Sequence, residues 1–256
     1  ERTERALNWF ATHLEGRQLS EITYDNILKL RALREGEGAA LSTINREFSV
    51  LRSILRRCVE PWKLIESVPK VPMYRLAKIQ PRWITREQAH ALLGKLPRHS
   101  RDMMIFALAT GLRRSNVTGM EWSRIDMKRG TAYVPANEAK GREAITVPLN
   151  PHALAVLERW KQYHEDHPKW PHRYVFVFRS RAPIYQVTTR VWRKACAAVG
   201  LEGVTFHTMR HSWASWQIQA ETPLKMLQEL GGWATSTPAL LGPDAREKPR
   251  RRKDLR

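Results

Sequence analysis

The sequence predicts a mainly α protein with a small antiparallel sheet, in which a helical N-terminal domain precedes a larger mixed α+β domain. Apolar side chains recur every three or four residues along most of the chain, as in helices that bury one face. Pro61, Pro69 and Pro72 end the first helical run, which indicates a domain boundary. Near the middle of the chain, two short β-rich segments flank a polar turn, as in a hairpin.

The N-terminal domain is expected to contain three helices. The first is predicted over residues 4–14, and the second runs from the N-cap Thr23 to about Arg34. Ser42 is expected to cap the third helix, which has an apolar face and a basic face and is therefore amphipathic. The inward side chains of the second helix are expected to be Ile27, Leu30 and Leu33.

The second domain begins after a basic stretch without periodicity. Thr85 and Gln88 form a capping-box pattern, and Gly111 is placed to end a buried helix over residues 103–109. The elements expected after it are a hairpin of Thr131–Val134 and Ile145–Val147, a helix from Pro151 to about His164, a strand at Val175–Phe178, and helices at 188–199, 206–219 and from Pro223 to Gly231. The expected domains are a helical domain over 1–72, a linker over 73–84, a mixed domain over 85–234 and an irregular basic tail over 235–256.

Charge is the strongest compositional signal. The chain holds 44 Lys and Arg against 25 Asp and Glu, a net charge of +19. So large a surplus repels itself unless a polyanion offsets it, and the planar fork of arginine suits phosphate, so nucleic acid is the expected partner. Cys58 and Cys196 form no metal-ligand pattern and are expected to be reduced thiols of a cytoplasmic protein. No apolar run reaches about 18 residues, so no membrane partner is expected.

Five residues suit chemistry at a phosphodiester. Arg113 follows the buried helix, His207 and Arg210 share one helix face, Lys140 lies at the hairpin tip, and Trp233 follows two glycines. Taken singly, each is more typical of an ordinary surface or core residue. Together, two arginines and two N–H donors could meet the negative charge of a pentacoordinate phosphate, and a lysine could protonate the leaving oxygen.

The order of these residues resembles that of the tyrosine recombinase, or phage integrase, family. The similarity extends over essentially the whole chain to about Thr235. It is carried by segments 108–122 (LATGLRRSNVTGMEW), 139–149 (AKGREAITVPL), 206–215 (FHTMRHSWAS) and 227–233 (LQELGGW), and in the N-terminal domain by Ser42–Arg46 and the helix that follows. The resemblance implies a SAM-like core-binding domain and a tyrosine-recombinase catalytic domain that together clamp duplex DNA.

The resemblance also implies roles for the five residues. Arg113 and Arg210 would bind the scissile phosphate, His207 and Trp233 would donate hydrogen bonds to it, and Lys140 would be the general acid. No metal or other cofactor would be needed. In the N-terminal domain, the residues expected to contact DNA are Thr43, Asn45, Arg46 and Arg52.

Two positions depart from the family pattern. Asn116 stands where the family usually has Asp or Glu, which is expected to weaken the site without removing it. Gly242 stands where the family has its nucleophilic tyrosine, and the last tyrosine of the chain is Tyr185. The loss of resemblance after Thr235 suggests a frameshifted or replaced C-terminus, and the early helices are expected to be truncated at their N-terminal side.

Two hypotheses follow. The first is a site-specific recombinase of prophage type, impaired in strand cleavage because its nucleophile is absent. The second is a non-catalytic DNA-binding protein that occupies recombination sites. Expected partners are double-stranded DNA, further copies of the chain on paired sites and DNA-bending accessory proteins, in the bacterial cytoplasm. Type IB topoisomerases share similar chemistry, but the compact helical N-terminal domain makes them the weaker resemblance.

Overall fold

A computed structural model of the chain describes residues 2–77, 82–139, 143–168, 173–178 and 183–232. The chain divides into an N-terminal unit of residues 1–79 and a C-terminal unit of residues 80–256. Each unit has a core of its own, and each is described separately below. No helix among the described residues is long and apolar enough to cross a membrane.

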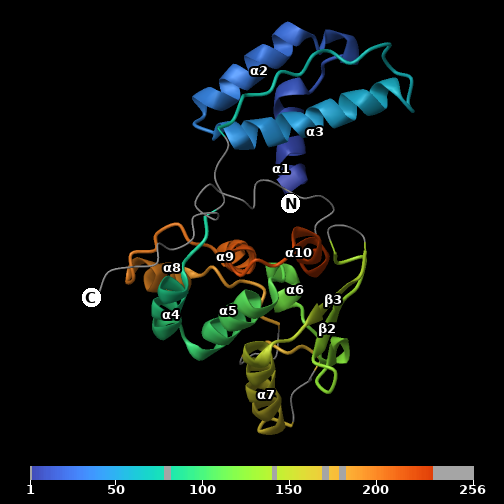
Figure 1. Ribbon diagram of the computed structural model, residues 1–256. Helices are drawn as coiled ribbons and strands as arrows, with labels where there is room; N and C mark the ends of the chain where they lie inside the picture. Colours follow the sequence, from blue (N-terminus) through green and yellow to red (C-terminus); the bar gives the residue numbers. More distant parts are fainter. Residues whose placement is uncertain (1, 78–81, 140–142, 169–172, 179–182, 233–256) are drawn as a thin grey trace. The chain divides into compact units, whose positions relative to one another are not determined.

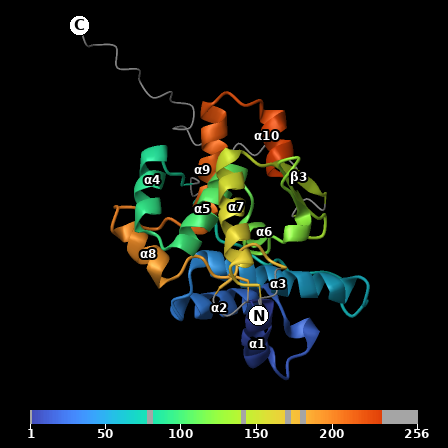
Figure 2. The ribbon, with the colours of Figure 1, turned by 90° about the horizontal axis from the view of Figure 1, so that it is seen from below.

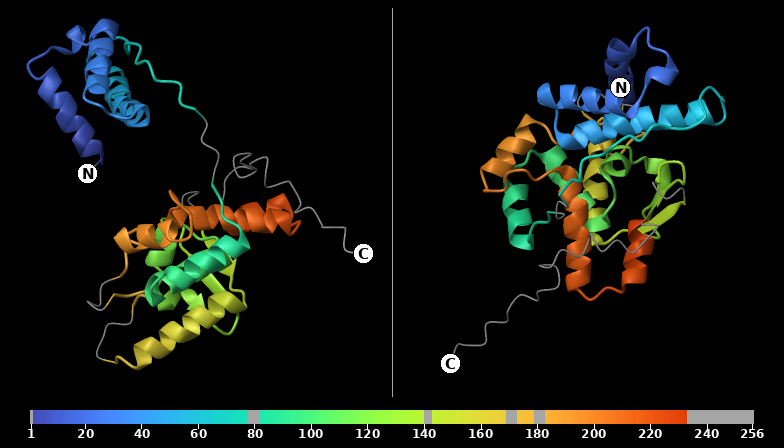
Figure 3. Two further views of the ribbon diagram at one scale, coloured as in Figure 1. Left: turned by 90° about the vertical axis from the view of Figure 1, so that its left-hand side faces the viewer. Right: turned by 90° about the horizontal axis from the view of Figure 1, so that it is seen from above.

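The N-terminal unit is built from three helices, as the sequence predicts (Figure 1). They are α1 (Arg2–Leu14), α2 (Tyr24–Gly36) and α3 (Leu41–Val59), with a short 3-10 turn at Leu19–Glu21. Helix α3 packs against both α1 and α2, and its course can be followed in Figure 3. The core is formed by Phe10, Ile22, Ile27, Leu30, Ile44, Phe48, Leu51, Leu55 and Val71. The rings of Phe10 and Phe48 meet edge to face at 5.2 Å.

Two details of this unit differ from the prediction. Leu33 is 46% exposed, and it is the next residue, Arg34, that reaches Glu47 of α3. Ser42 does not cap α3, since the helix already begins at Leu41 and its N-cap residue, Ala40, makes no side-chain bond. The predicted cap Thr23 is confirmed, because its side chain accepts a hydrogen bond from the backbone N–H of Asn26.

The segment after α3 is fastened back onto the N-terminal unit at Tyr74. The Asn45 side chain donates to the carbonyl of Tyr74 at 2.9 Å and accepts from its N–H at 2.7 Å. The phenol of Tyr74 donates to Glu35 at 2.8 Å, and the guanidinium of Arg31 lies over its ring. The chain therefore stays attached to the helical unit as far as Tyr74.

The C-terminal unit combines helices with a three-stranded antiparallel sheet of order β1-β2-β3. Its helices are α4 (Arg86–Lys95), α5 (Arg98–Thr110), α6 (Arg114–Thr118), α7 (Pro151–Glu165), α8 (Arg190–Ala197), α9 (Phe206–Gln219) and α10 (Leu224–Gly231), with a 3-10 turn at Trp122–Arg124. Its strands are β1 (Ile125–Asp126), β2 (Thr131–Val134) and β3 (Ile145–Pro148). The predicted hairpin is confirmed, with Val134 opposite Ile145.

Helix α5 lies at the centre of this unit and packs against α7 and α9 (Figure 2). Its side chains Met103, Met104, Phe106 and Ala107 are fully buried. The predicted capping box starts α4: Gln88 N–H donates to the Thr85 hydroxyl at 3.2 Å, and Thr85 N–H donates to the Gln88 side chain at 2.9 Å. Local signals of this kind fix where the helices around the core begin.

The predicted strand at residues 175–178 is wrong. Only isolated bridges form there, between Glu121 and Tyr174 and between Val177 and Pro183. The segment is apolar because it fills the core and not because it joins the sheet: the ring of Phe176 meets that of Phe106 at 5.5 Å and that of Trp160 at 5.4 Å. The short helix α6 and strand β1 are further elements that the sequence did not predict.

Candidate phosphate-binding site

Arg113 is presented by a tight turn between α5 and α6. Gly111 ends α5 with a φ of +67°, as expected for a glycine in the left-handed region, and Arg113 is the N-cap residue of α6. A Cβ on Gly111 would lie 2.3 Å from the ring of Trp213, so α9 approaches the turn closely. The half-buried Arg113 side chain donates through Nη2 to the carbonyl of Gly232 at 3.2 Å.

Arg210 reaches the same place from the middle of α9. Its side chain is buried and donates to the carbonyl of Gly111 at 2.7 Å and to that of Gly231 at 2.5 Å. The two arginines that the sequence singled out are therefore brought together, between the turn at Gly111 and the C-terminal end of α10. Burial, followed by the positive charge of Arg113, lowers the pKa of Arg210 to about 9, so the guanidinium stays charged at neutral pH.

Two histidines lie on α9 with Arg210. His207 is exposed in the first turn of the helix, and His211 lies one turn further on. Their rings meet edge to face with centroids 4.7 Å apart and an interplanar angle of 88°. Burial, and then the charges of His207 and Arg210, lower the pKa of His211 to about 4, so His211 is neutral at physiological pH. The structure thus places the exposed His207 three residues before the buried Arg210 on α9.

Three residues predicted for this site lie outside the described residues. Lys140, Trp233 and Gly242 belong to this group. The chain leading to Lys140 is fixed as far as Ala139, which is buried, and Arg124 binds the carboxylate of Glu138 through two hydrogen bonds of 2.7 and 2.8 Å. A hydrogen-bonded guanidinium fork thus anchors one stem of the hairpin.

The end of α10 is held against the sheet. Gly232 adopts a left-handed conformation with a φ of +59°. A Cβ at this position would lie 2.2 Å from the Cδ1 atom of Ile145 on β3, so any larger residue would require the Ile145 side chain to shift. The carbonyls at this helix end carry the negative end of the helix dipole, and they are the groups to which both arginines donate.

The site offers more hydrogen-bond capacity than its protein neighbours use. Among the described residues, Arg113 Nη1, Asn116 Nδ2 and His211 Nδ1 are buried without a hydrogen-bond partner. No cluster of three His, Cys, Asp or Glu suited to a metal ion occurs in the described part of the chain. Buried donors that have no partner are rare in proteins, and here one belongs to Arg113 and another to Asn116, three residues later on α6. Chemically, this arrangement suits an oxyanion such as a phosphate group.

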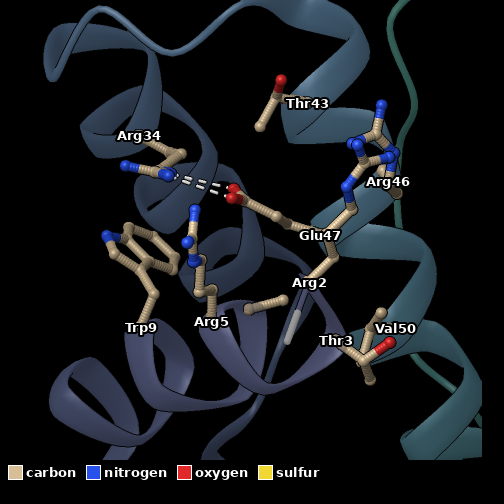
Figure 4. Close-up of a pocket in the computed structure, with 10 residues that line it drawn as sticks. Arg2, Thr3, Arg5, Trp9, Arg34, Thr43, Arg46, Glu47 and Val50 are labelled. Atoms are coloured by element: carbon tan, nitrogen blue, oxygen red, sulfur yellow. Dashed lines mark hydrogen bonds and ion pairs between the residues drawn. The ribbon is translucent and has the colours of Figure 1, made fainter. Parts of the chain in front are cut away.

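A second basic surface lies in the N-terminal unit, in a hollow of about 470 Å³ between α1 and α3 (Figure 4). Its lining residues are Arg2, Thr3, Arg5, Ala6, Trp9, Arg34, Thr43, Arg46, Glu47 and Val50. Arg34 is bound to Glu47 through bonds of 2.8 and 2.9 Å and to Glu37 at 2.6 Å. The two glutamates raise the pKa of Arg34, so this arginine is held in place as part of the wall.

Of the four residues predicted to contact DNA in the N-terminal unit, only two line this hollow. Thr43 and Arg46 line the hollow, whereas Asn45 binds Tyr74, and the half-buried Arg52 of α3 is not among the lining residues. The α1 residues were missed by the sequence analysis. The basic character of Arg2 and Arg5 is visible in the sequence, but only the packing of α1 on α3 shows that they line the same hollow as Arg46. The missed residues are Arg2, Arg5 and Trp9.

Comparison with known proteins decides the family. Residues 82–238, more than half of the chain, match the model described as phage integrase family. The chain belongs to the phage integrase family. The integrase of Salmonella phage P22 is 31% identical over 268 residues, a match that covers 89% of this chain and 67% of that integrase. The tyrosine recombinase XerD of Lacticaseibacillus casei is 29% identical, over 77% of this chain and 70% of that enzyme.

Solved structures of the family share the fold. The lambda integrase(75-356) dimer bound to a COC' core site has a TM-score of 0.72 and 20% sequence identity, and covers 92% of this chain and 87% of its own. The Tn1549 transposon integrase in complex with a circular intermediate DNA has a TM-score of 0.75 and 16% identity, and covers 93% of this chain and 86% of its own. The mainly helical fold with a small antiparallel sheet, predicted from the sequence, is confirmed.

Proposed function

We propose that the chain is a DNA-binding recombinase of the phage integrase type, a site-specific recombinase by descent, whose strand cleavage is impaired because the nucleophilic tyrosine is absent. The observation that carries this proposal is the meeting of Arg113 and Arg210 at one site. These residues lie far apart in the sequence, and their convergence matches the roles that the family resemblance gives them. Membership of the family supports the reaction class.

In this proposal the two guanidiniums bind the scissile phosphate of duplex DNA. Fixed cations and N–H donors stabilise the charge that gathers on a pentacoordinate phosphate, without a metal or other cofactor. His207 and Trp233 supply further hydrogen bonds, and Lys140 protonates the departing sugar oxygen. The step that the chain lacks is the covalent one, since Gly242 has no group that could attack phosphorus.

The N-terminal unit is proposed to bind the same DNA with the hollow between α1 and α3. Arg2, Arg5 and Arg46 present guanidiniums there beside the hydroxyl of Thr43, and such groups bind phosphate oxygens. Residues 1–72 are then the core-binding domain, residues 73–84 the linker, residues 85–234 the catalytic domain and residues 235–256 a basic tail. Further copies of the chain on paired sites and DNA-bending proteins are the proposed partners, in the bacterial cytoplasm.

A nicked suicide substrate carrying the candidate attachment site tests the proposal. We expect tight DNA binding without a covalent adduct on a denaturing gel. If six or more phosphates are neutralised, affinity should fall by roughly 10³-fold or more between about 50 and 200 mM salt. A covalent adduct would mean that another residue attacks, and a flat salt response would count against the clamp.

The alternative, a non-catalytic protein that occupies recombination sites, uses the same phosphate contacts. The observation that raises this alternative is Gly242 at the position expected for the nucleophilic tyrosine. A competition assay distinguishes this alternative from an inactive protein without a function at the site. Under the alternative, the protein should block recombination by an intact integrase on the same attachment site. Unimpeded recombination at saturating protein concentration would argue against this alternative.

A further inference from the structure

Asn116 is a buried polar residue whose hydrogen bonding is incomplete. It lies on α6, three residues after Arg113, and only 3% of it is exposed. Its Oδ1 atom accepts a hydrogen bond from the Ser115 hydroxyl at 3.2 Å. Within the described part of the chain, its Nδ2 atom has no hydrogen-bond partner, and neither has Nη1 of Arg113. Two buried groups on the same short helical turn are therefore without acceptors.

The chemistry of Asn116 Nδ2 and Arg113 Nη1 defines which ligand could accept their hydrogen bonds. Both can only donate, and the oxygen of the Asn116 amide is already engaged. A buried donor without a partner costs about 1–3 kcal/mol, and more when it is charged. A carboxylate at position 116 could accept a hydrogen bond from Arg113 and offset the positive charge of its guanidinium. The amide of Asn116 is neutral and cannot offset that charge. The groups therefore lack an acceptor with negative charge and at least two oxygens.

We propose that Asn116 is a further phosphate-binding residue, which donates through Nδ2 to an oxygen of the anion that Arg113 and Arg210 bind. This inference rests on the proposed function, since it concerns the same phosphate site. The ligand is a phosphate group, either of the DNA backbone or free in solution. Because position 116 carries no negative charge, the site binds inorganic phosphate even in the absence of DNA.

The test measures the dissociation constant of inorganic phosphate for the whole chain, from thermal unfolding at constant ionic strength with chloride as the replaced anion. Phosphate should raise the melting temperature of the wild type in a saturable manner. Asn116→Asp should weaken phosphate binding by about tenfold or more, because a carboxylate repels the anion. Asn116→Leu, which removes the donor without adding charge, should weaken it by a smaller factor.

Arg114→Gln is the matched control. It changes the net charge by the same amount as Asn116→Asp and lies next in sequence to Arg113, but Arg114 is exposed. If Asn116 binds the anion directly, this control should change phosphate affinity by less than about twofold, because exposed charges are screened. Equal losses in Asn116→Asp and Arg114→Gln would show a general charge effect and overturn the inference.

Other outcomes separate this inference from the proposed function. A folded Asn116→Asp protein that keeps wild-type phosphate affinity overturns the role of Asn116, whatever the DNA result. Failure of the wild type to bind phosphate overturns it as well. Phosphate binding that depends on Asn116 in a protein that does not bind duplex DNA would support the anion site and reject the proposed function. Loss of DNA binding in Asn116→Asp, parallel to the loss of phosphate binding, would identify the backbone phosphate as the ligand.

Discussion

Replacement of Gly111 by alanine should damage the turn that holds both arginines. An L-residue in the left-handed region costs roughly 1–2 kcal/mol. The new Cβ would also lie 2.3 Å from the ring of Trp213, which is buried at 4% exposure and cannot move away freely. Such overpacking costs typically about 1–3 kcal/mol. We therefore expect Gly111→Ala to lower the free energy of unfolding by about 2–5 kcal/mol.

Gly200→Ala provides the matched control for this change. Gly200 has nearly the same φ, +68° against +67° at Gly111, but nothing lies within 4 Å of the position where its Cβ would be. It should therefore show only the conformational cost, about 1–2 kcal/mol. Urea unfolding followed by circular dichroism measures both variants. Equal losses in the two would refute the argument that close approach of α9 to the turn makes Gly111 necessary.

Three further predictions concern both units. Asn45→Ala should lower the stability of the N-terminal unit, measured by urea unfolding, by about 1–2 kcal/mol through two lost hydrogen bonds. Arg46→Ala is the control: it should leave urea unfolding unchanged and reduce the salt slope of DNA binding by about one. Glu47→Gln should cost about 1–3 kcal/mol in the same assay, because it removes the more buried of the two carboxylates that bind Arg34; an unchanged midpoint would make the pair dispensable. His211 has a folded-state pKa of about 4 against an ordinary value of 6.5, so the unfolded state takes up its proton first. Stability should therefore be complete above about pH 6.5 and fall by about 1–3 kcal/mol toward pH 4, a slope that His211→Gln should flatten.

Much of the fold could be predicted because its signals are local. The capping box at Thr85 and the glycine at Gly111 each depend on a few neighbouring residues, and both were placed correctly. The apolar segment at 175–178 was mistaken for a strand because burial alone does not distinguish a strand from core-filling irregular chain. The exposure of Leu33 depends on where the neighbouring helix lies, which the periodicity of one helix does not contain.

The candidate site was predicted as a set of residues but not as an arrangement. Arg210 donates to Gly111, 99 residues earlier, and to Gly231, so the backbone carbonyls that orient it come from two distant turns. No spacing in the sequence indicates such a contact. Asn45 shows the opposite limit: its place on a basic helix face suggested DNA, while its two hydrogen bonds serve Tyr74.

The bond between Asn45 and Tyr74 also sets the length of the covalent tether. The chain is fixed to one unit at Tyr74 and to the other at Ile84, whose N–H and carbonyl bind Ser212 and Trp216. Ten peptide steps separate these two points, which span at most about 35 Å when fully extended. Under the proposed function, in which both units bind one DNA molecule, a connection this short would give the second unit an effective concentration in the millimolar range once the first has bound. The affinities of the two surfaces would then combine, and a single proteolytic cut between Tyr74 and Ile84 would remove this covalent contribution.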